Sequence, residues 1–458
     1  MTDKVIFFLL CAAVVFTTLV YGAVHQPTIA VFYLLAVVIA CLWAFDAFSS
    51  GVLRFNKNSI QIPLVAAALY GLIQTIPFGA LAETSGVSGI PRTVSLDPFW
   101  TQVAALHFFA FSIYLAALLT FIDGAKRLRA MCAFITIFGF VFAFFAILQA
   151  VLSPNKIYGI YEVPNTVPFG SFVNRHDFAA FMEMTIAVPL GLMFAGAIPR
   201  DKRLLYITAI GLMGIALLLS GSRGGLISLL AEIFFLVFLT TKNEARGSFA
   251  VKIGLAILLV VTIIFGAILI GGESSLTRFA ETAASSDFST SRRHIWSVTL
   301  DVIKNNLPFG AGFGAFGAAY TTYDSFNGLA RVEQAHNDYL QVLADAGIVG
   351  LIIGAFFIFR LFRSGWENGK TAPDTFRRGV AFGALAGCFA VLVHSLFDFV
   401  LHITAVALLF VTLISLVIAS GADADDKAEA DERADEQARN LATVTPIGGV
   451  RKGLGKIR

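Results

Sequence analysis

The sequence predicts an all-α polytopic membrane protein with about twelve transmembrane helices and one outer loop that carries short interfacial helices. Of its 458 residues, 57% are hydrophobic and 14% are charged, whereas soluble domains are about 45–50% apolar and about 25% charged. The mean hydropathy of +0.80 agrees. This composition excludes a water-soluble globular protein, a coiled coil and a disordered chain.

The charge balance gives no sign of a nucleic-acid partner. The chain holds 33 Lys and Arg residues against 30 Asp and Glu residues, for a net charge of +3. No dense basic stretch lies in the body of the chain, as a nucleic-acid-binding surface would require. The lipid bilayer is therefore the first partner that we expect.

Apolar stretches long enough to cross a bilayer recur along the chain. The candidate spans are 4–24, 28–48, 60–79, 100–123, 130–153, 177–197, 204–220, 225–241, 253–271, 347–363, 379–397 and 399–420. No small-residue cleavage site closes the first stretch cleanly, so we expect a retained helix rather than a signal peptide. Residues 1–420 then form one transmembrane domain.

Two regions lie outside these spans. Residues 272–346 form the outer loop, which is polar enough to be solvated. Residues 421–458 open with acidic and end with basic side chains and hold few apolar ones, which predicts a disordered tail.

The distribution of Lys and Arg predicts the orientation of the spans. If the N-terminus is inside, the positively charged loops, such as 126–129, 200–203 and 360–378, all fall on the inner side. This alternation follows the positive-inside rule. Both termini are then cytoplasmic.

The segment Ser220-Gly221-Ser222-Arg223-Gly224-Gly225 separates two spans on the outer side. Ser222 is a candidate cap for the following helix, and the glycines permit a tight turn. A helix N-terminus beside the guanidinium of Arg223 suits an anion such as a phosphate. The alternative is a tight turn whose arginine reaches the lipid headgroups.

Arg292 and Arg293 open a helix-like run in the outer loop that continues to about residue 305. Ile295, Thr299 and Val302 share one face of this run, which predicts an amphipathic helix at the membrane interface. Two arginines in its first turn oppose the helix dipole, and an anion between them would relieve that conflict. Ordinary headgroup contacts are the alternative. Farther along, Gly310, Gly312 and Gly314 predict a turn that brings the backbone close to another element.

His336 begins a segment that places it, Leu340 and Leu343 on one helical face near the outer membrane surface. An imidazole there can accept a proton from a hydroxyl near neutral pH, so His336 is a candidate general base. Asp338 could orient a neighbour, but not His336 across the same helix. An exposed or structural histidine is the alternative.

Two further clusters flank spans on the outer side. Asn174 and Arg175 precede Asp177, which is a candidate helix cap. His394 and His402 lie at the turn between the last two spans, with an acid midway at position 398. Because the chain turns within this motif, hydrogen bonds between helices are favoured over a metal site.

Together these motifs resemble the O-antigen ligase and polymerase superfamily of bacterial inner-membrane glycosyltransferases. The resemblance rests on the Ser-Gly-Ser-Arg-Gly-Gly segment, the Arg-x-x-x-Trp run, the Gly-x-Gly-x-Gly turn and the segments that begin at His336 and His394, with Phe172-Val-Asn-Arg175 upstream. It covers roughly residues 60–420, and the order and sidedness of the motifs make it specific.

The resemblance implies transfer of a glycan from undecaprenyl pyrophosphate, at the periplasmic face, to an acceptor hydroxyl on another glycan or on the lipid A core. It implies that Arg223 and one of Arg292 and Arg293 hold the pyrophosphate and that His336 is the general base. Cofactors and metals are not expected, and direct displacement would invert the anomeric centre. Candidate supporting residues are Asn174, Arg175, Asn337, Asp338, His394 and His402.

Two alternatives stay open at this stage. These residues do not distinguish a ligase from a polymerase. They therefore do not distinguish lipopolysaccharide synthesis from exopolysaccharide synthesis. The rival class is a membrane transporter or flippase of lipid-linked glycans. The absence of an internal repeat and the clustering of the notable charges on one side favour the enzyme.

Overall fold

The computed structural model describes residues 2–84, 87–122, 124–164, 166–241, 254, 257, 260–261, 287–325 and 332–421. One compact unit covers Met1–Gly421. Its described residues are mostly helical and include almost no sheet, which confirms the predicted all-α fold. The predicted span 253–271 lies mostly outside the described residues, and the predicted tail lies outside them apart from its first residue.

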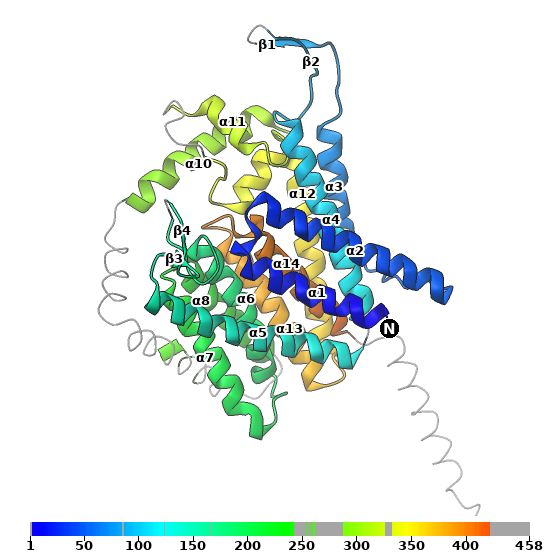
Figure 1. Cartoon of the computed structure of the whole chain (residues 1–458), viewed down its shortest axis with the longest axis vertical. Coiled ribbons are helices and arrows are strands. Elements are labelled where there is room, and N and C mark those ends of the chain that lie inside the picture. The colour runs from blue at the N-terminus through cyan, green and yellow to red at the C-terminus, as the bar shows by residue number, and fades with distance from the viewer. Residues whose placement is uncertain are drawn as a thin grey trace, which may run out of the picture. The chain divides into compact units, whose positions relative to one another are not determined.

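Figure 1 shows the helices of the described residues. They are α1 (Thr2–Leu19), α2 (Gln26–Ser50), α3 (Ile62–Gln74), α4 (Pro98–Phe121), α5 (Ala125–Leu152), α6 (Arg175–Phe194), α7 (Arg203–Leu219), α8 (Arg223–Thr241), α10 (Asp287–Asn306), α11 (Phe316–Tyr323), α12 (Asp338–Thr371), α13 (Thr375–His394) and α14 (Thr404–Ala419). Two small hairpins complete the fold, β1 (Ala82–Thr84) with β2 (Val87–Ile90), and β3 (Lys156–Ile157) with β4 (Tyr161–Glu162).

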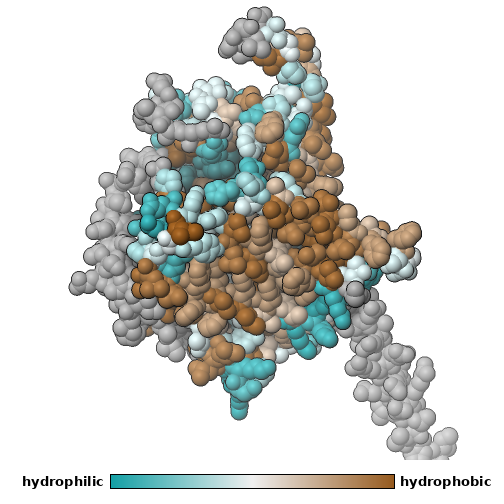
Figure 2. Space-filling model, viewed as in Figure 1, coloured by the Kyte–Doolittle hydropathy of each residue, from teal (hydrophilic) through white to brown (hydrophobic). Residues whose placement is uncertain are grey.

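Among the described residues, nine helices are long and apolar enough to cross a membrane. Two further apolar helices are shorter: the segment Ser59–Gln74, which joins a 3₁₀ turn to α3, and α14. Together these eleven correspond one by one to the predicted spans other than 253–271. Many apolar side chains on their surface are exposed, and Figure 2 shows hydrophobic residues over α1 and α2. Exposure of such a large apolar surface to water is unfavourable, so the helices are suited to contact lipid.

Helices α6 and α13 pack closely at the centre of the unit because glycines line their contact. A side chain on Gly191 would place its Cβ 2.4 Å from the Cα of Gly383 and 2.5 Å from the carbonyl oxygen of Gly379. Glycine at this spacing lets two membrane helices approach backbone to backbone. Arg175 and His394, at the neighbouring ends of these helices, are positioned by this contact.

We expect Gly191→Ala to destabilise the protein by about 1–3 kcal/mol, because the added methyl group meets backbone atoms that cannot rotate away. Gly211→Ala is the matched control, since a Cβ at Gly211 of α7 meets nothing within 4 Å. The melting temperatures of the two purified variants in detergent measure the difference. Equal melting temperatures would contradict the proposed close packing.

Helices α10 and α11 lie together near the start of α12, at the upper end of the view in Figure 1. Ile295, Val298 and Val302 of α10 are buried, so the predicted apolar face exists. It packs on α11 and on Ala335 and Ala344, and Trp296 donates a hydrogen bond from Nε1 to the carbonyl oxygen of Ala335. The face expected to meet lipid is therefore covered by the protein itself.

The glycine turn after α10 makes the predicted close approach. Gly310, Gly312 and Gly314 all have positive φ angles of 78°, 109° and 73°. A Cβ on Gly310 would lie 2.4 Å from the backbone of Asp345 in α12. The turn thus fastens the end of α10 to α12, close to the residues discussed next.

Candidate functional site

A cavity of about 230 Å³ lies where several helix ends meet, and three arginines line it. Arg175 begins α6, Arg223 begins α8 and Arg292 lies in α10. The full lining consists of Arg175, His176, Gly221, Arg223, Gly224, Ile227, Arg292, His394, Phe397 and Asp398. Three arginines around one small cavity make it a candidate site for an anion with several oxygen atoms.

The predicted cap at the start of α8 is confirmed. The hydroxyl oxygen of Ser222 accepts a hydrogen bond from the backbone N–H of Gly225 at 3.1 Å, and the same oxygen lies 2.8 Å from Nδ1 of His176. Gly221 has a φ angle of 69°, which a residue with a side chain rarely adopts. The cap at Ser222 and the turn at Gly221 together place Arg223 at the N-terminus of α8, where the helix dipole favours an anion.

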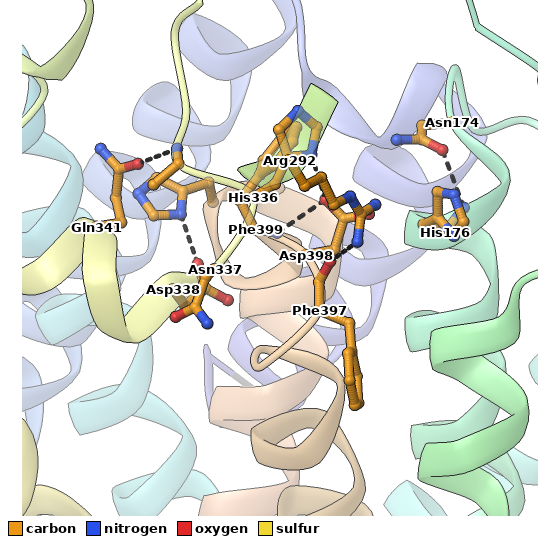
Figure 3. A network of polar contacts seen from close by, with 12 residues as sticks. Asn174, His176, Arg292, His336, Asn337, Asp338, Gln341, Phe397, Asp398 and Phe399 are labelled. Carbon is orange, nitrogen blue, oxygen red and sulfur yellow. Dashed lines mark hydrogen bonds and ion pairs between the residues drawn. The ribbon is translucent and has the colours of Figure 1, made fainter. Parts of the chain in front are cut away.

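Asp398 joins the arginine side of the site to the predicted base (Figure 3). Its Oδ2 lies 3.2 Å from a guanidinium nitrogen of Arg292, and its Oδ1 lies 3.0 Å from Nδ1 of His336. Arg292 also donates a hydrogen bond to the carbonyl oxygen of Phe397. A single buried carboxylate therefore holds both side chains, although 62 residues separate His336 from Asp398.

Asp398 is held as a carboxylate by these neighbours. Burial raises its pKa, but the hydrogen bond with His336 and the charges of His176, His336 and Arg292 lower it by more. The net pKa lies well below the ordinary value for aspartate. An ionised Asp398 can only accept hydrogen bonds, so Nδ1 of His336 carries a hydrogen, and in the neutral imidazole Nε2 is the nitrogen with the lone pair.

The structure distinguishes Arg292 from Arg293, which the sequence alone does not. Arg292 lines the cavity, whereas Arg293 is exposed and does not line it. The prediction that both lie in the first turn is wrong, because α10 begins at Asp287 and places them in its second turn. Consecutive helical residues point about 100° apart, so the two arginines face different directions.

His336 precedes helix α12 instead of lying on its face. The helix begins at Asp338, and His336 itself has a φ angle of 50°. The expected helical face with Leu340 is therefore wrong at its first residue. Asn337 caps the helix through Oδ1, which accepts the N–H groups of Tyr339 and Leu340, and its amide donates to the carbonyl oxygen of Leu396.

Asp338 orients a neighbour other than His336, as predicted. Its Oδ1 lies 2.8 Å from Nδ1 of His402, and its Oδ2 accepts hydrogen bonds from the hydroxyl of Ser395 and the N–H of Leu401. These contacts fasten the start of α12 to the chain between α13 and α14. Through these contacts, Asn337 and Asp338 position His336. The side chain of His402 takes part in the contacts of Asp338 and does not line the cavity.

The pair of His402 and Asp338 should make the protein less stable at alkaline pH. Partial desolvation lowers the pKa of the half-exposed His402, but the hydrogen bond and charge of Asp338 and the charge of Asp345 raise it above the ordinary 6.5. A raised pKa stabilises the fold below the unfolded value, and this stabilisation is lost as the pH rises through the folded value. We expect His402→Gln to lower the melting temperature at about pH 5.5 and to change it less at about pH 9. Equal shifts at both pH values in a thermal melt would contradict this.

The remaining predicted residues take separate roles. Asn174, not Asp177, caps α6, because its Oδ1 accepts the N–H of His176. His394 lines the cavity and contacts Glu183. His394, Asp398 and His402 thus share no partner, and the described residues hold no cluster of three His, Cys, Asp or Glu side chains arranged for a metal ion.

Local sequence does not identify three contributors to the site, Asp398, His176 and Glu183. A carboxylate inside an apolar span was the available signal for Glu183, because such groups are costly in a bilayer. For Asp398 and His176 the decisive contacts link distant parts of the chain, so no local pattern reveals them.

Residues 208–355 match the family model described as O-antigen ligase. The match includes Arg223, Arg292 and His336. No curated protein matches the chain. The family match confirms the resemblance given by the motifs, and the multiple apolar helices agree with it. The match covers less than half of the chain and supports its similarity to the O-antigen ligase family over residues 208–355. The match and the multiple apolar helices indicate a multi-pass bacterial membrane protein.

Proposed function

We propose that the protein is a glycosyltransferase that moves a glycan from undecaprenyl pyrophosphate to an acceptor hydroxyl. The observation that carries the proposal is the cavity lined by Arg175, Arg223 and Arg292, with Asp398 linking Arg292 to His336. A cluster of cations beside a base suits a reaction in which a diphosphate leaves while a hydroxyl is deprotonated.

The arginines would hold the diphosphate and stabilise it as it leaves. The bond between the anomeric carbon and the phosphate oxygen breaks, and its electron pair adds negative charge to the diphosphate. Guanidinium groups that are already oriented stabilise that charge without reorganisation. Their planar forks also match the oxygen atoms of phosphates better than an ammonium group does.

His336 would activate the acceptor. With Nδ1 donating to Asp398, Nε2 takes the proton of the attacking hydroxyl as the new bond to the anomeric carbon forms. The imidazolium that results is stabilised by the Asp398 carboxylate. General base catalysis of this kind contributes a factor of about 10²–10⁴. A single displacement inverts the anomeric configuration, and the scheme calls for no metal or cofactor.

The site would face the periplasm, with both chain termini in the cytoplasm and the chain in the bacterial inner membrane. Arg175, Arg223 and the start of α12 lie at helix ends that the positive-inside rule assigns to the outer side. The undecaprenyl chain would then lie among apolar helices while its diphosphate enters the cavity.

The acceptor decides between the possible pathways. A lipid A core acceptor makes the protein a ligase of lipopolysaccharide synthesis, and a second lipid-linked repeat makes it a polymerase. Deleting the gene and separating the cell's glycans on a gel tests this. A bare core with polymer on the carrier indicates a ligase, single repeats on the core indicate a polymerase, and loss of a secreted polymer alone indicates exopolysaccharide synthesis. Unchanged glycans would contradict the proposal.

The flippase alternative is separated by reconstitution. Purified protein in nanodiscs has no second compartment, so a flippase forms no product there. With an acceptor present, a glycosyltransferase moves the glycan from the lipid carrier to the acceptor hydroxyl and releases undecaprenyl pyrophosphate, and chromatography resolves both products.

A further inference from the structure

We propose that His394 donates a hydrogen bond from Nε2 to the diphosphate in the cavity and that Glu183 is the positioning residue that keeps the hydrogen on this nitrogen. The inference rests on the proposed function and adds a histidine donor from α13 to the three arginines.

The two residues form a buried pair at the cavity wall. Nδ1 of His394 lies 3.2 Å from Oε2 and 3.4 Å from Oε1 of Glu183 in α6. Both side chains are fully buried. Within the described residues, Glu183 has no other hydrogen-bond or ion-pair partner. The pair therefore relies on itself for neutralisation.

Burial selects the state in which the pair carries no net charge, because an uncompensated charge is costly away from water. Of its forms, the one in which Nδ1 donates to the carbonyl oxygen of a protonated Glu183 leaves the buried carboxyl hydrogen unpaired and is disfavoured. Two forms remain. In one, the protonated carboxyl of Glu183 donates to Nδ1, and the imidazole hydrogen is on Nε2. In the other, the proton has moved to His394, which then carries hydrogens on both nitrogens. In both forms Nε2 is a donor.

This donor has no acceptor in the described part of the chain. Nε2 of His394 is buried and makes no hydrogen bond there, and an unmade hydrogen bond of a buried polar group is unfavourable. A ligand that accepts hydrogen bonds would satisfy it. His394 lines the same cavity as Arg223 and Arg292, whose guanidiniums are donors only, so the shared ligand must supply acceptor oxygens.

The absence of a side chain at Gly224 allows the imidazole of His394 to lie against α8. A Cβ on Gly224 would lie 2.8 Å from both Nε2 and Cδ2 of His394. Without it, the edge of the imidazole rests against the first turn of α8, a 19-residue helix whose N-terminus favours an anion. The helix end and the unpaired donor point to the same ligand chemistry, a phosphate group.

Nε2 has opposite hydrogen-bonding roles in the two histidines: it is a donor in His394 and an acceptor in His336. Asp398 is ionised and pairs with Arg292, so it leaves Nε2 of His336 free to accept a proton. Glu183 has no arginine partner among its described contacts, so it leaves Nε2 of His394 as a donor. One histidine would thus serve the acceptor hydroxyl and the other the leaving diphosphate.

Two substitutions of His394 separate this role from a structural one. In His394→Gln, the amide N–H reaches the position of Nε2 and the contact with Glu183 is lost. In His394→Asn, the shorter amide reaches the position of Nδ1 and keeps Glu183, but nothing is donated to the cavity. The probe is undecaprenyl pyrophosphate bound to the full-length protein in nanodiscs, with neutral undecaprenol as the control ligand.

We expect His394→Asn to weaken undecaprenyl pyrophosphate binding about ten- to one-hundred-fold, the usual effect of losing a hydrogen bond to a charged group. His394→Gln should bind it nearly as the native protein does, and undecaprenol binding should not change. Native binding by His394→Asn, or equal weakening by both variants, would overturn the inference.

Glu183 provides a second test if the His394 variants do not fold. Glu183→Gln keeps an N–H that can donate to Nδ1, so binding should be retained. Glu183→Leu leaves the tautomer unrestrained and should weaken binding of the pyrophosphate but not of undecaprenol. Equal binding by both variants would overturn the positioning role.

Arg223→Ala distinguishes failure of this inference from failure of the proposed function. If Arg223→Ala also binds undecaprenyl pyrophosphate normally, the proposed diphosphate site is wrong. If Arg223→Ala loses binding while the two His394 variants behave alike, only the role of His394 is wrong.

Discussion

Arg223→Ala is expected to reduce glycan transfer by about 10²–10³-fold, the usual effect of removing one preorganised donor from a developing negative charge. The loss should appear both in binding of the lipid-linked donor and in the rate of the chemical step, because the diphosphate gains charge as it leaves. Arg223→Lys keeps the charge but not the planar fork, so it should recover only part of the activity. Product formation by purified protein in nanodiscs is the measurement.

Arg293→Ala is the matched control for this prediction. Arg293 neighbours the cavity-lining Arg292 in α10 but is exposed and lines no part of the cavity. Its removal changes the net charge by the same amount as Arg223→Ala. We therefore expect nearly native transfer, and an equal loss in both variants would show that overall positive charge, not the cavity, supports activity.

His336→Ala is expected to reduce the turnover rate by about 10²–10⁴-fold while binding of the lipid-linked donor is retained, because the base acts on the acceptor hydroxyl. Asp398→Asn should have a related effect, since an amide can donate to Nδ1 and so place the hydrogen on Nε2, where it blocks the base. A comparison of turnover rate with donor affinity checks both expectations.

His294→Ala is the control for the histidine. Nε2 of His294 lies 2.8 Å from Asp324, so this variant also breaks a pair between a histidine and an aspartate, but away from the cavity lining. We expect native turnover. Loss of donor binding in His336→Ala, or an equal loss of turnover in His294→Ala, would contradict the general-base role.

Elements set by local sequence could be predicted. Each described span was predicted because an apolar run of sufficient length is a local signal. The cap at Ser222 and the close turn at Gly310 were predicted for the same reason, since caps and positive φ angles depend on a few adjacent residues.

The assembly of the site could not be predicted in the same way. The pairs His336 with Asp398 and His394 with Glu183 join residues 62 and 211 positions apart. Only the packing of α6, α12 and α13 brings them together. The choice between Arg292 and Arg293 depended on where α10 begins, and helix boundaries are the least certain part of a sequence-based prediction.

The position of a bound diphosphate tests the central claim most directly. A cryo-electron microscopy map of the native protein with undecaprenyl pyrophosphate in a nanodisc should show both phosphates in the cavity between Arg175, Arg223 and Arg292. Diphosphate density outside this cavity, with the three guanidiniums turned away from it, would contradict the account.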